Sequence, residues 1–179
     1  MRIIAGYHKG RVLKRVGKKT TRETADMVKE SVFNMIQGRS YRMVLDLFAG
    51  SGAYGLEALS RGAKYLYAID RDKDAIKTVF DNAKMLDVTE HMTILQRDYE
   101  QFLKGVGNIY FDLVFLDPPY DFEPYDQLLV QINDLVEEDG IVVVETKKQN
   151  ELNDQYQDLI KIKEKTYGIK RVTIFQKIK

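Results

Sequence analysis

The chain has 179 residues, of which 44% are hydrophobic, and its net charge is +1. This length suits one domain with a modest extension, and the composition is that of an ordinary globular protein. The absence of cysteine excludes disulfides and thiolate metal sites, two histidines are too few for a histidine-rich metal centre, and no apolar run approaches the roughly 20 residues of a membrane span. We therefore expect a metal-free, cytoplasmic protein.

Basic residues are concentrated at the start of the chain. Residues 1–42 hold 11 Lys and Arg against 3 Asp and Glu, so they carry +8, whereas the remainder carries −7. Such a segment is the electrostatic footprint of a polyanion contact, and nucleic acid is the natural candidate. The alternative is a solvated tail that only keeps the protein soluble. We expect residues 1–40 to form a basic extension and residues 41–179 to form the main domain.

The predicted elements follow in chain order. The extension should contain a short, glycine-rich β-hairpin and then a helix over residues 23–36, where apolar side chains recur at helical spacing. From residue 41 strands and helices alternate, which predicts a mostly parallel sheet covered on both faces. The expected strands are 43–48, 65–69, 92–96, 111–116 and 141–145, and the expected helices are 52–61, 72–86, 99–104 and 125–136. Two last strands, 159–166 and 171–178, predict an antiparallel hairpin that completes a seven-stranded sheet.

A glycine-rich turn follows the first strand of the main domain. Gly50, Gly52 and Gly55 have the spacing G-x-G-x-x-G between a strand and a helix, which lets a cofactor approach the backbone closely. This spacing also suits a dinucleotide-binding oxidoreductase. The carboxylate of Asp46 at the strand end would repel a pyrophosphate, but it would attract the ammonium and sulfonium groups of S-adenosylmethionine. The residues predicted to bind this cofactor here are Asp46, Phe48, Ala49, Gly50, Ser51 and Gly52.

The next two strands are also followed by acids. Asp70 lies 20 residues after Gly50, where a carboxylate binds ribose hydroxyls in nucleotide-binding folds of this type. Asp98 follows the third strand and is placed to accept a hydrogen bond from an adenine amino group. A helix cap is the alternative role for each acid. Together with Arg71 and Tyr99, they complete the predicted cofactor site.

The strand over residues 111–116 ends in Asp117-Pro118-Pro119-Tyr120. Two prolines stiffen the backbone and remove two N–H donors, so the loop presents carbonyl oxygens. The exocyclic amine of a nucleic-acid base could then donate one N–H to the Asp117 carboxylate and the other to the Pro118 carbonyl, while the base stacks on Tyr120. This geometry holds the amine lone pair toward a methyl donor. These four residues are therefore the predicted catalytic residues of an S-adenosylmethionine-dependent amino methyltransferase.

The same motifs and the start of the chain resemble one family. The bacterial 16S ribosomal RNA guanine-N2 methyltransferases of the RsmD type are similar to this chain in Arg2-Ile3-Ile4-Ala5-Gly6, Gly10-Arg11-Val12-Leu13, Thr21-Arg22-Glu23-Thr24-Ala25-Asp26, LDLFAGSGAYGLEALSRGA and FDLVFLDPPY. The chain departs from the family's usual proline at Glu23, and from its usual arginines at Met27 and Lys29.

This resemblance implies a class I, Rossmann-like methyltransferase fold with a small N-terminal extension. It implies a guanine of 16S rRNA as the substrate, within the small ribosomal subunit or its assembly intermediate, and S-adenosylhomocysteine as a product. It also implies RNA contacts by Arg11, Thr21 and Arg22. We expect the protein to be a monomer.

Three other interpretations share parts of the pattern. A DNA methyltransferase acting on adenine or cytosine amines would use the same catalytic loop, although the chain offers no large target-recognition domain. A non-catalytic RNA-binding assembly factor would use the basic extension but would not need the Asp117–Tyr120 run. The carboxylate of Asp46 disfavours a dinucleotide oxidoreductase.

Overall fold

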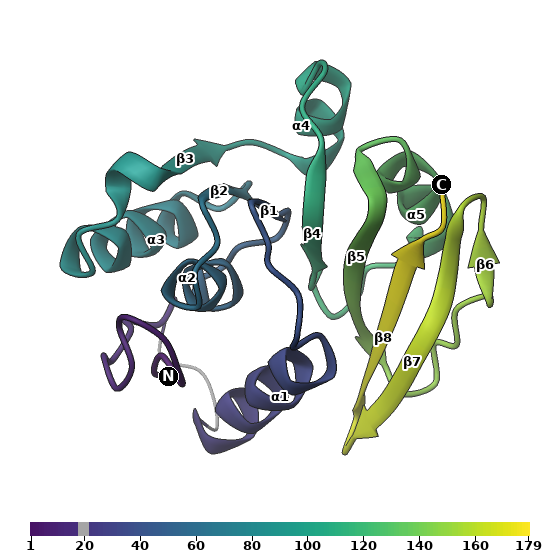
Figure 1. The fold of residues 1–179 in the computed structure, drawn as a ribbon. Helices are drawn as coiled ribbons and strands as arrows, with labels where there is room; N and C mark the ends of the chain where they lie inside the picture. Colours follow the sequence, from purple (N-terminus) through teal and green to yellow (C-terminus); the bar gives the residue numbers. More distant parts are fainter. Residues whose placement is uncertain (18–21) are drawn as a thin grey trace.

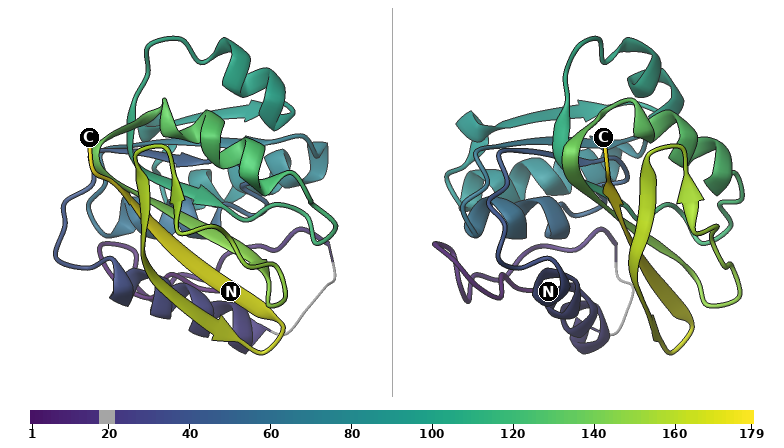
Figure 2. Two further views of the ribbon diagram at one scale, coloured as in Figure 1. Left: turned by 90° about the vertical axis from the view of Figure 1, so that its right-hand side faces the viewer. Right: turned by 45° about the vertical axis from the view of Figure 1, so that its right-hand side comes forward.

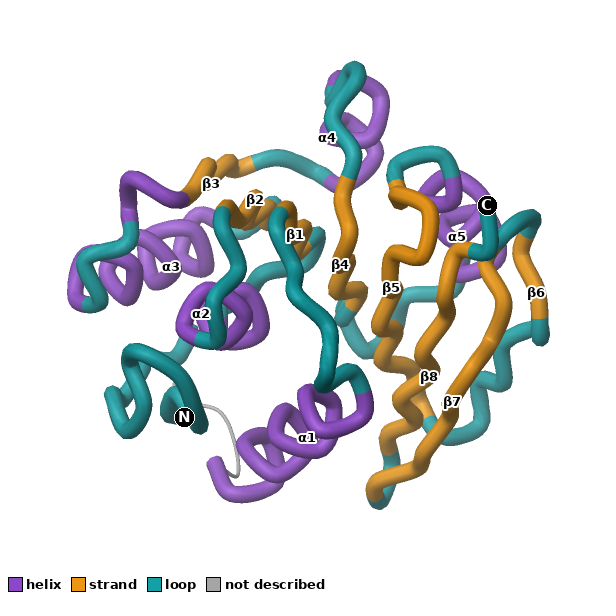
Figure 3. The backbone as a smooth tube through the Cα atoms, in the orientation of Figure 1, coloured by secondary structure: helices purple, strands orange, loops and turns teal. Residues whose placement is uncertain are grey.

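The computed structural model describes residues 1–17 and 22–179, in which strands and helices alternate (Figures 1 and 3). The helices are α1 (Arg22–Met35), α2 (Ala53–Ser60), α3 (Lys73–Met85), α4 (Tyr99–Gly105) and α5 (Tyr125–Asn133), with a short 3₁₀ helix at Thr89–His91. The strands are β1 (Met43–Asp46), β2 (Tyr65–Asp70), β3 (Met92–Gln96), β4 (Phe111–Leu116), β5 (Val136–Lys147), β6 (Gln155–Tyr156), β7 (Leu159–Tyr167) and β8 (Lys170–Lys177). Among these residues, no helix is long and apolar enough to cross a membrane.

The strands form one sheet in the order β3-β2-β1-β4-β5-β8-β7-β6. The first five in this order pair in parallel, whereas β8, β7 and β6 each pair antiparallel with their neighbours. The predicted α/β class, the parallel sheet and the C-terminal antiparallel hairpin are thus confirmed. The sheet has eight strands where seven were expected, because the two-residue strand β6 pairs with β7.

Helices cover both faces of the sheet (Figures 1 and 2): α1, α2 and α3 lie on one face, and α4 and α5 on the other. Alternate strand residues therefore enter different cores, as the two-residue period of a strand requires. In β4, Leu113 and Phe115 pack with α1 and α2, whereas Val114 and Leu116 pack with α5. Because the parallel strands share a direction, their carboxyl ends meet at one edge, where ligands bind in such sheets.

The end of α5 differs from the prediction. We expected a helix over residues 125–136, but it ends at Asn133 and Val136 already belongs to β5. The backbone N–H of Phe111 donates to the Leu135 carbonyl at 2.8 Å, and Val136 pairs with Phe111. These sheet bonds draw the chain out of the helix, so β5 is also longer than the five residues predicted.

Residues 1–17 form an arm that packs on the main domain. An isolated antiparallel bridge joins Arg2 and Val12, and Ile3 is buried in the same core as α1 and α2. Gly6 has φ +88°, and a Cβ there would lie 1.9 Å from the Ser60 carbonyl oxygen. Only glycine therefore allows the arm to lie this close to the end of α2.

Candidate active site

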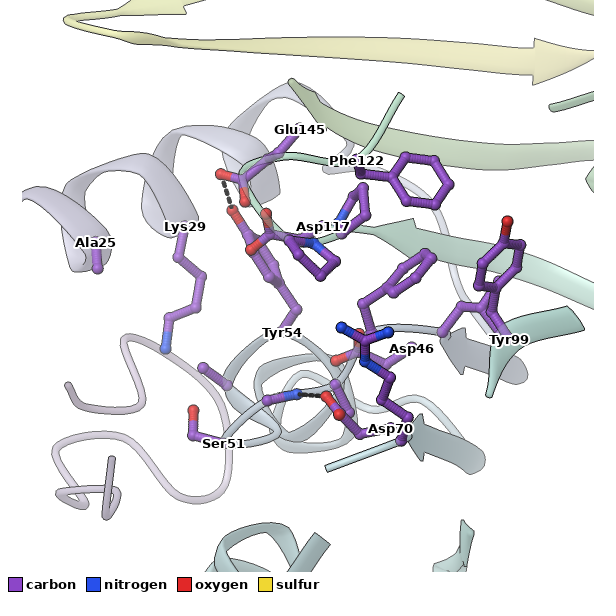
Figure 4. A pocket seen from close by; sticks show the side chains of 18 of the residues that line it. Ala25, Lys29, Asp46, Ser51, Tyr54, Asp70, Tyr99, Asp117, Phe122 and Glu145 are labelled. Atoms are coloured by element: carbon purple, nitrogen blue, oxygen red, sulfur yellow. Dashed lines mark hydrogen bonds between the residues drawn. The ribbon is translucent and has the colours of Figure 1, made fainter. Parts of the chain in front are cut away.

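A cavity of about 480 Å³ opens at the carboxyl edge of the parallel strands (Figure 4). Its walls come from the loops after β1, β2, β3 and β4, from the end of β5, and from α1. Most of the predicted cofactor and catalytic residues line it: Asp46, Phe48, Ala49, Gly50, Ser51, Asp70, Arg71, Asp98, Tyr99, Asp117, Pro118 and Pro119. The structure places Gly52 behind the cavity wall, as the buried N-cap of α2, and Tyr120 at a neighbouring hollow.

The glycine turn is held by the acids around it. Gly50 and Gly52 have φ values of 57° and 85°, which favour glycine, and the turn therefore bends sharply between β1 and α2. The N–H of Gly50 donates to Oδ2 of Asp70 at 2.9 Å, and the N–H of Gly55 donates to Oδ2 of Asp46 at 3.3 Å. Asp46 and Asp70 thus brace the turn from two strands while they face the cavity.

Asp46 is an almost fully buried carboxyl group, with 2% of its surface exposed. Burial raises its pKa to about 7; the bond from Gly55 opposes this rise, and the nearby charges of Asp70 and Glu145 add to it. An anion in this position is shielded from solvent, and no ion pair with Asp46 is found among residues 1–17 and 22–179, so a bound cation would stabilise it.

Asp70 and Asp98 differ in their local roles. Asp72, and not Asp70, caps α3 by accepting from the N–H of Asp74 at 3.0 Å. Asp98 does cap α4, because it accepts from the N–H of Glu100 at 2.9 Å, and it lines the cavity as well. The alternative role of a helix cap is therefore present for Asp98 and absent for Asp70.

Aromatic rings form one wall of the cavity. The ring centroids of Phe48, Tyr99 and Phe122 lie 5.4–5.6 Å from one another, and Phe122 also contacts the ring of Tyr125 at 4.9 Å. The carbonyl of Pro119 accepts from the N–H of Phe122 at 2.9 Å, which closes a turn behind the catalytic loop. The rings are tilted by 47–70° against one another, so the wall offers both faces and edges of aromatic rings to a base or an adenine ring.

A cluster of acids and tyrosine lies at the ends of β4 and β5 (Figure 4). The hydroxyl of Tyr54 donates to Oε1 of Glu145 at 3.1 Å, and the hydroxyl of Tyr125 donates to the Glu145 carbonyl at 3.2 Å. Burial, the charge of Glu145 and a side-chain hydrogen bond with it raise the pKa of Asp117 well above its usual range. Asp117 is therefore a more basic carboxylate than a solvated one.

Lys170, at the start of β8, faces this acid cluster. The charges of Glu145 and Asp117 raise the pKa of its ammonium group, although burial opposes them. Lys170, Glu145 and Asp117 line both the main cavity and a smaller hollow of about 120 Å³ beside it. Tyr120 lines this smaller hollow; 67% of its surface is exposed, and the Lys147 ammonium lies 4.2 Å from its ring centroid.

The sequence analysis did not identify Tyr54, Glu145, Lys170 and Lys29 as site residues, yet all four line the cavity. The sequence could have indicated Glu145, because this acid stands at the end of the strand predicted over residues 141–145. Tyr54 lies within the glycine-loop motif. The two lysines come from α1 and β8, and nothing in their local sequence indicates the cavity.

The basic extension is largely tied to the main domain. Lys29 is 2% exposed, lies 3.1 Å from Glu57 and donates to the Arg2 carbonyl at 2.7 Å. Arg11 is exposed, and its Nη2 donates to the Met85 carbonyl at 3.0 Å. Thr21 lies outside the described residues, and Arg22 is the first residue of α1.

Within residues 1–17 and 22–179, no group of three or more His, Asp or Glu side chains is arranged to hold a metal ion. The cavity instead combines carboxylates, a glycine turn and aromatic rings.

The fold is that of the S-adenosylmethionine-dependent, Rossmann-like methyltransferases. The chain belongs to the family described as Conserved hypothetical protein 95, whose model matches residues 1–176. It is 43% identical over 186 residues to the Bacillus subtilis (strain 168) protein named "Putative rRNA methyltransferase YlbH", with 99% of each chain covered. It is 35% identical to "Ribosomal RNA small subunit methyltransferase D" of Haemophilus influenzae, covering 98% of this chain and 93% of that one.

Solved structures agree with these relatives. The structure titled "Putative methyltransferase yhhF from Escherichia coli" superposes with a TM-score of 0.87 at 27% identity, covering 99% of this chain and 97% of that chain. The family resemblance predicted from the sequence motifs is confirmed.

Proposed function

We propose that this protein transfers a methyl group from S-adenosylmethionine to the exocyclic N2 amine of a guanine in 16S rRNA. The observation that carries the proposal is the Asp117-Pro118-Pro119 loop, which opens into the same cavity as the glycine turn and Asp70. Two relatives named as ribosomal RNA methyltransferases, one of them for the small subunit, support the choice of substrate.

The cavity fits the proposed cofactor group by group. Asp46 is a buried carboxyl group that has no ion-pair partner in the part of the chain that the structure describes, and S-adenosylmethionine carries an ammonium and a sulfonium. Asp70 is placed for ribose hydroxyls, and the wall of Phe48, Tyr99 and Phe122 offers a surface for adenine. When bound, this cofactor supplies an electrophilic methyl group.

The catalytic loop holds the amine. In the proposed complex the Asp117 carboxylate accepts one N–H of the guanine amine and the Pro118 carbonyl accepts the other, so the lone pair is directed at the methyl carbon. The nitrogen would take the methyl group that the bound cofactor supplies, with S-adenosylhomocysteine as the other product. The methylated nitrogen is then strongly acidic, and Asp117 takes its proton and passes it to solvent. The raised pKa of Asp117 supports this last role.

The affinity for S-adenosylmethionine should depend on the charge of Asp46. Ionised Asp46 attracts the cationic cofactor and protonated Asp46 does not, so binding should tighten by about tenfold between pH 6 and pH 8, around a pKa of about 7. Calorimetric titration of the wild type and of Asp46→Asn measures this. Asp46→Asn should bind the cofactor more weakly and lose the pH dependence that comes from Asp46. Titration of the cofactor's own amine changes the affinity of the wild type and of the variant alike. Identical pH profiles would refute the role of Asp46.

The proposed RNA contact is the basic extension, residues 1–40, with Arg11, Thr21 and Arg22 as the contacting residues. Lys29 adds nothing to it, because its ammonium is buried against Glu57. The double variant Arg11→Ala, Arg22→Ala should weaken RNA binding and lower the slope of log affinity against log salt by about 1 per lost phosphate contact. Fluorescence anisotropy at several salt concentrations measures this slope, with Lys104→Ala, on the opposite face of the sheet, as the control. An unchanged slope would exclude this surface.

Methyl transfer tests the function directly. Labelled S-adenosylmethionine is supplied with naked 16S rRNA, with small subunits that lack the modification, or with duplex DNA, and the products are digested to nucleosides. We expect N2-methylguanosine from a ribosomal substrate alone. Label in DNA adenine or cytosine would replace the proposal with DNA methylation, and no label despite cofactor binding would indicate a non-catalytic RNA-binding factor.

A further inference from the structure

Three charged side chains at the cavity lie on neighbouring strands. Leu116 of β4 pairs in parallel with Val144 of β5, so Asp117 and Glu145 are the next residues along the two strands. Glu145 is 5% exposed, and its carboxylate is fixed by the hydroxyl of Tyr54 at 3.1 Å. Lys170 enters from β8, and both acids act on its charge. The site therefore presents two carboxyl groups, which act as acceptors when ionised, and one cationic donor.

The proposed mechanism needs one acid, Asp117, to hold the amine. It does not use Glu145 or Lys170. A buried carboxylate without a task is expensive to maintain, because it has lost solvent. Lys170 is exposed to solvent, so its ammonium group is free to turn toward a bound base. Their position beside Asp117, on the border between the main cavity and the smaller hollow, places them where the rest of the target base must lie.

The three amino bases differ next to the amine. Beside the N2 amine of guanine lies the ring N1–H, a donor, and beyond it O6, an acceptor. Beside the amines of adenine and cytosine lies a ring nitrogen that is an acceptor. A flipped base is read by hydrogen bonds to this edge. Along this edge guanine presents a donor (N2–H), a second donor (N1–H) and an acceptor (O6). A protein site that presents two acceptors followed by a donor is complementary to this order.

Resting on the guanine-N2 activity proposed above, we propose that Glu145 and Lys170 select guanine: Glu145 accepts the N1–H and Lys170 donates to O6. Asp117 accepts the neighbouring N2–H, so the three side chains read the edge in order. An adenine or cytosine would turn a ring lone pair toward the Glu145 carboxylate, which would leave two buried acceptors facing each other. The same pair of acids keeps Lys170 charged for its donor role.

The hydrogen bond from Tyr54 gives Glu145 the rigidity that selection requires. It occupies Oε1, and the hydroxyl of Tyr125 holds the backbone carbonyl of the same residue at 3.2 Å. A carboxylate fixed in this way cannot turn aside to avoid a mismatched base. A site whose buried groups form hydrogen bonds with the substrate strongly rejects an analogue that lacks the matching group.

The test uses the ribosomal substrate selected by the methylation assay, with the target guanosine replaced by 2-aminopurine riboside through ligation of a synthetic segment. This analogue keeps the amine but lacks N1–H and O6. For the wild type we expect kcat/KM for the analogue to fall by about 100-fold or more. Glu145→Gln keeps an oxygen for Tyr54 and adds an N–H that suits the bare ring nitrogen. The variant should therefore have a lower kcat/KM for guanosine. The ratio of kcat/KM for guanosine to kcat/KM for the analogue should fall by about tenfold or more.

Glu151→Gln, the same change at an exposed position, is the matched control and should keep the wild-type preference. Lys170→Met should lower activity on guanosine but not on the analogue, and it provides a second test if Glu145→Gln fails to fold. Equal activity of the wild type on guanosine and on the analogue would overturn the proposal. An equal loss of activity on the two substrates in the variants would also overturn it, since a purely structural role predicts that loss. Absence of any guanosine methylation by the wild type would instead overturn the proposed function.

Discussion

Asp117→Ala should lower the rate of methyl transfer by about 10²–10³-fold while it leaves S-adenosylmethionine binding nearly unchanged. Asp117 directly follows β4 and lines the cavity where the amine is proposed to lie. The groups proposed to hold the cofactor come from the ends of β1 and β2 and from the loops after β1, β2 and β3. Removal of the carboxylate takes away one acceptor for the amine and the group that receives its proton. The charge that develops on nitrogen then lacks its nearest counter-charge.

Single-turnover transfer of a labelled methyl group measures the rate, and calorimetry measures cofactor affinity separately. Asp117→Asn should retain part of the effect, because an amide oxygen still accepts one N–H but does not take up a proton. Asp121→Ala, an exposed acid four residues further along, serves as the matched control and should remain active. Full activity of Asp117→Ala would show that Asp117 neither positions the amine nor stabilises its charge.

Glu57→Ala should destabilise the protein by about 3–5 kcal/mol, because it leaves a buried lysine unpaired. Glu57 is fully buried on α2 and lies 3.1 Å from the Lys29 ammonium and 2.8 Å from Nε of Arg61. Its two oxygens also accept the N–H groups of Ile4 and Ala5 at 2.9 and 3.1 Å. One side chain thus joins the arm, α1 and α2, and burial already lowers the pKa of Lys29 despite this pairing.

Urea denaturation of Glu57→Ala measures the loss, and limited proteolysis of residues 1–17 reports whether the arm detaches. The double variant Lys29→Met, Glu57→Leu should recover part of the stability, since no buried charge is left without a partner. Glu30→Ala removes an exposed acid of α1 and should change the stability by less than about 0.5 kcal/mol. Equal stabilities of Glu57→Ala and the wild type would mean that the buried ion pair does not hold the arm.

The family departure at Lys29 illustrates a limit of sequence patterns. In the sequence it is a lysine in a basic extension, where the family usually has arginine, and it counts toward the charge offered to RNA. In the structure its ammonium lies inside the protein, between Glu57 and the Arg2 carbonyl. Net charge over a segment does not reveal which charges face solvent, because burial depends on partners far away in the chain.

The sequence by itself determined the fold class and all the acids that line the cavity except Glu145. Alternating strands and helices require a parallel sheet. Such a sheet places the residues at or just after the end of each strand, such as Asp46, Asp70 and Asp117, at one edge. Tertiary structure alone decided how this edge is completed. Lys170 reaches Glu145 because β8 inserts between β5 and β7, and α5 ends early because Phe111 bonds to Leu135. Both outcomes depend on pairing between segments distant in sequence, which local periodicity does not specify.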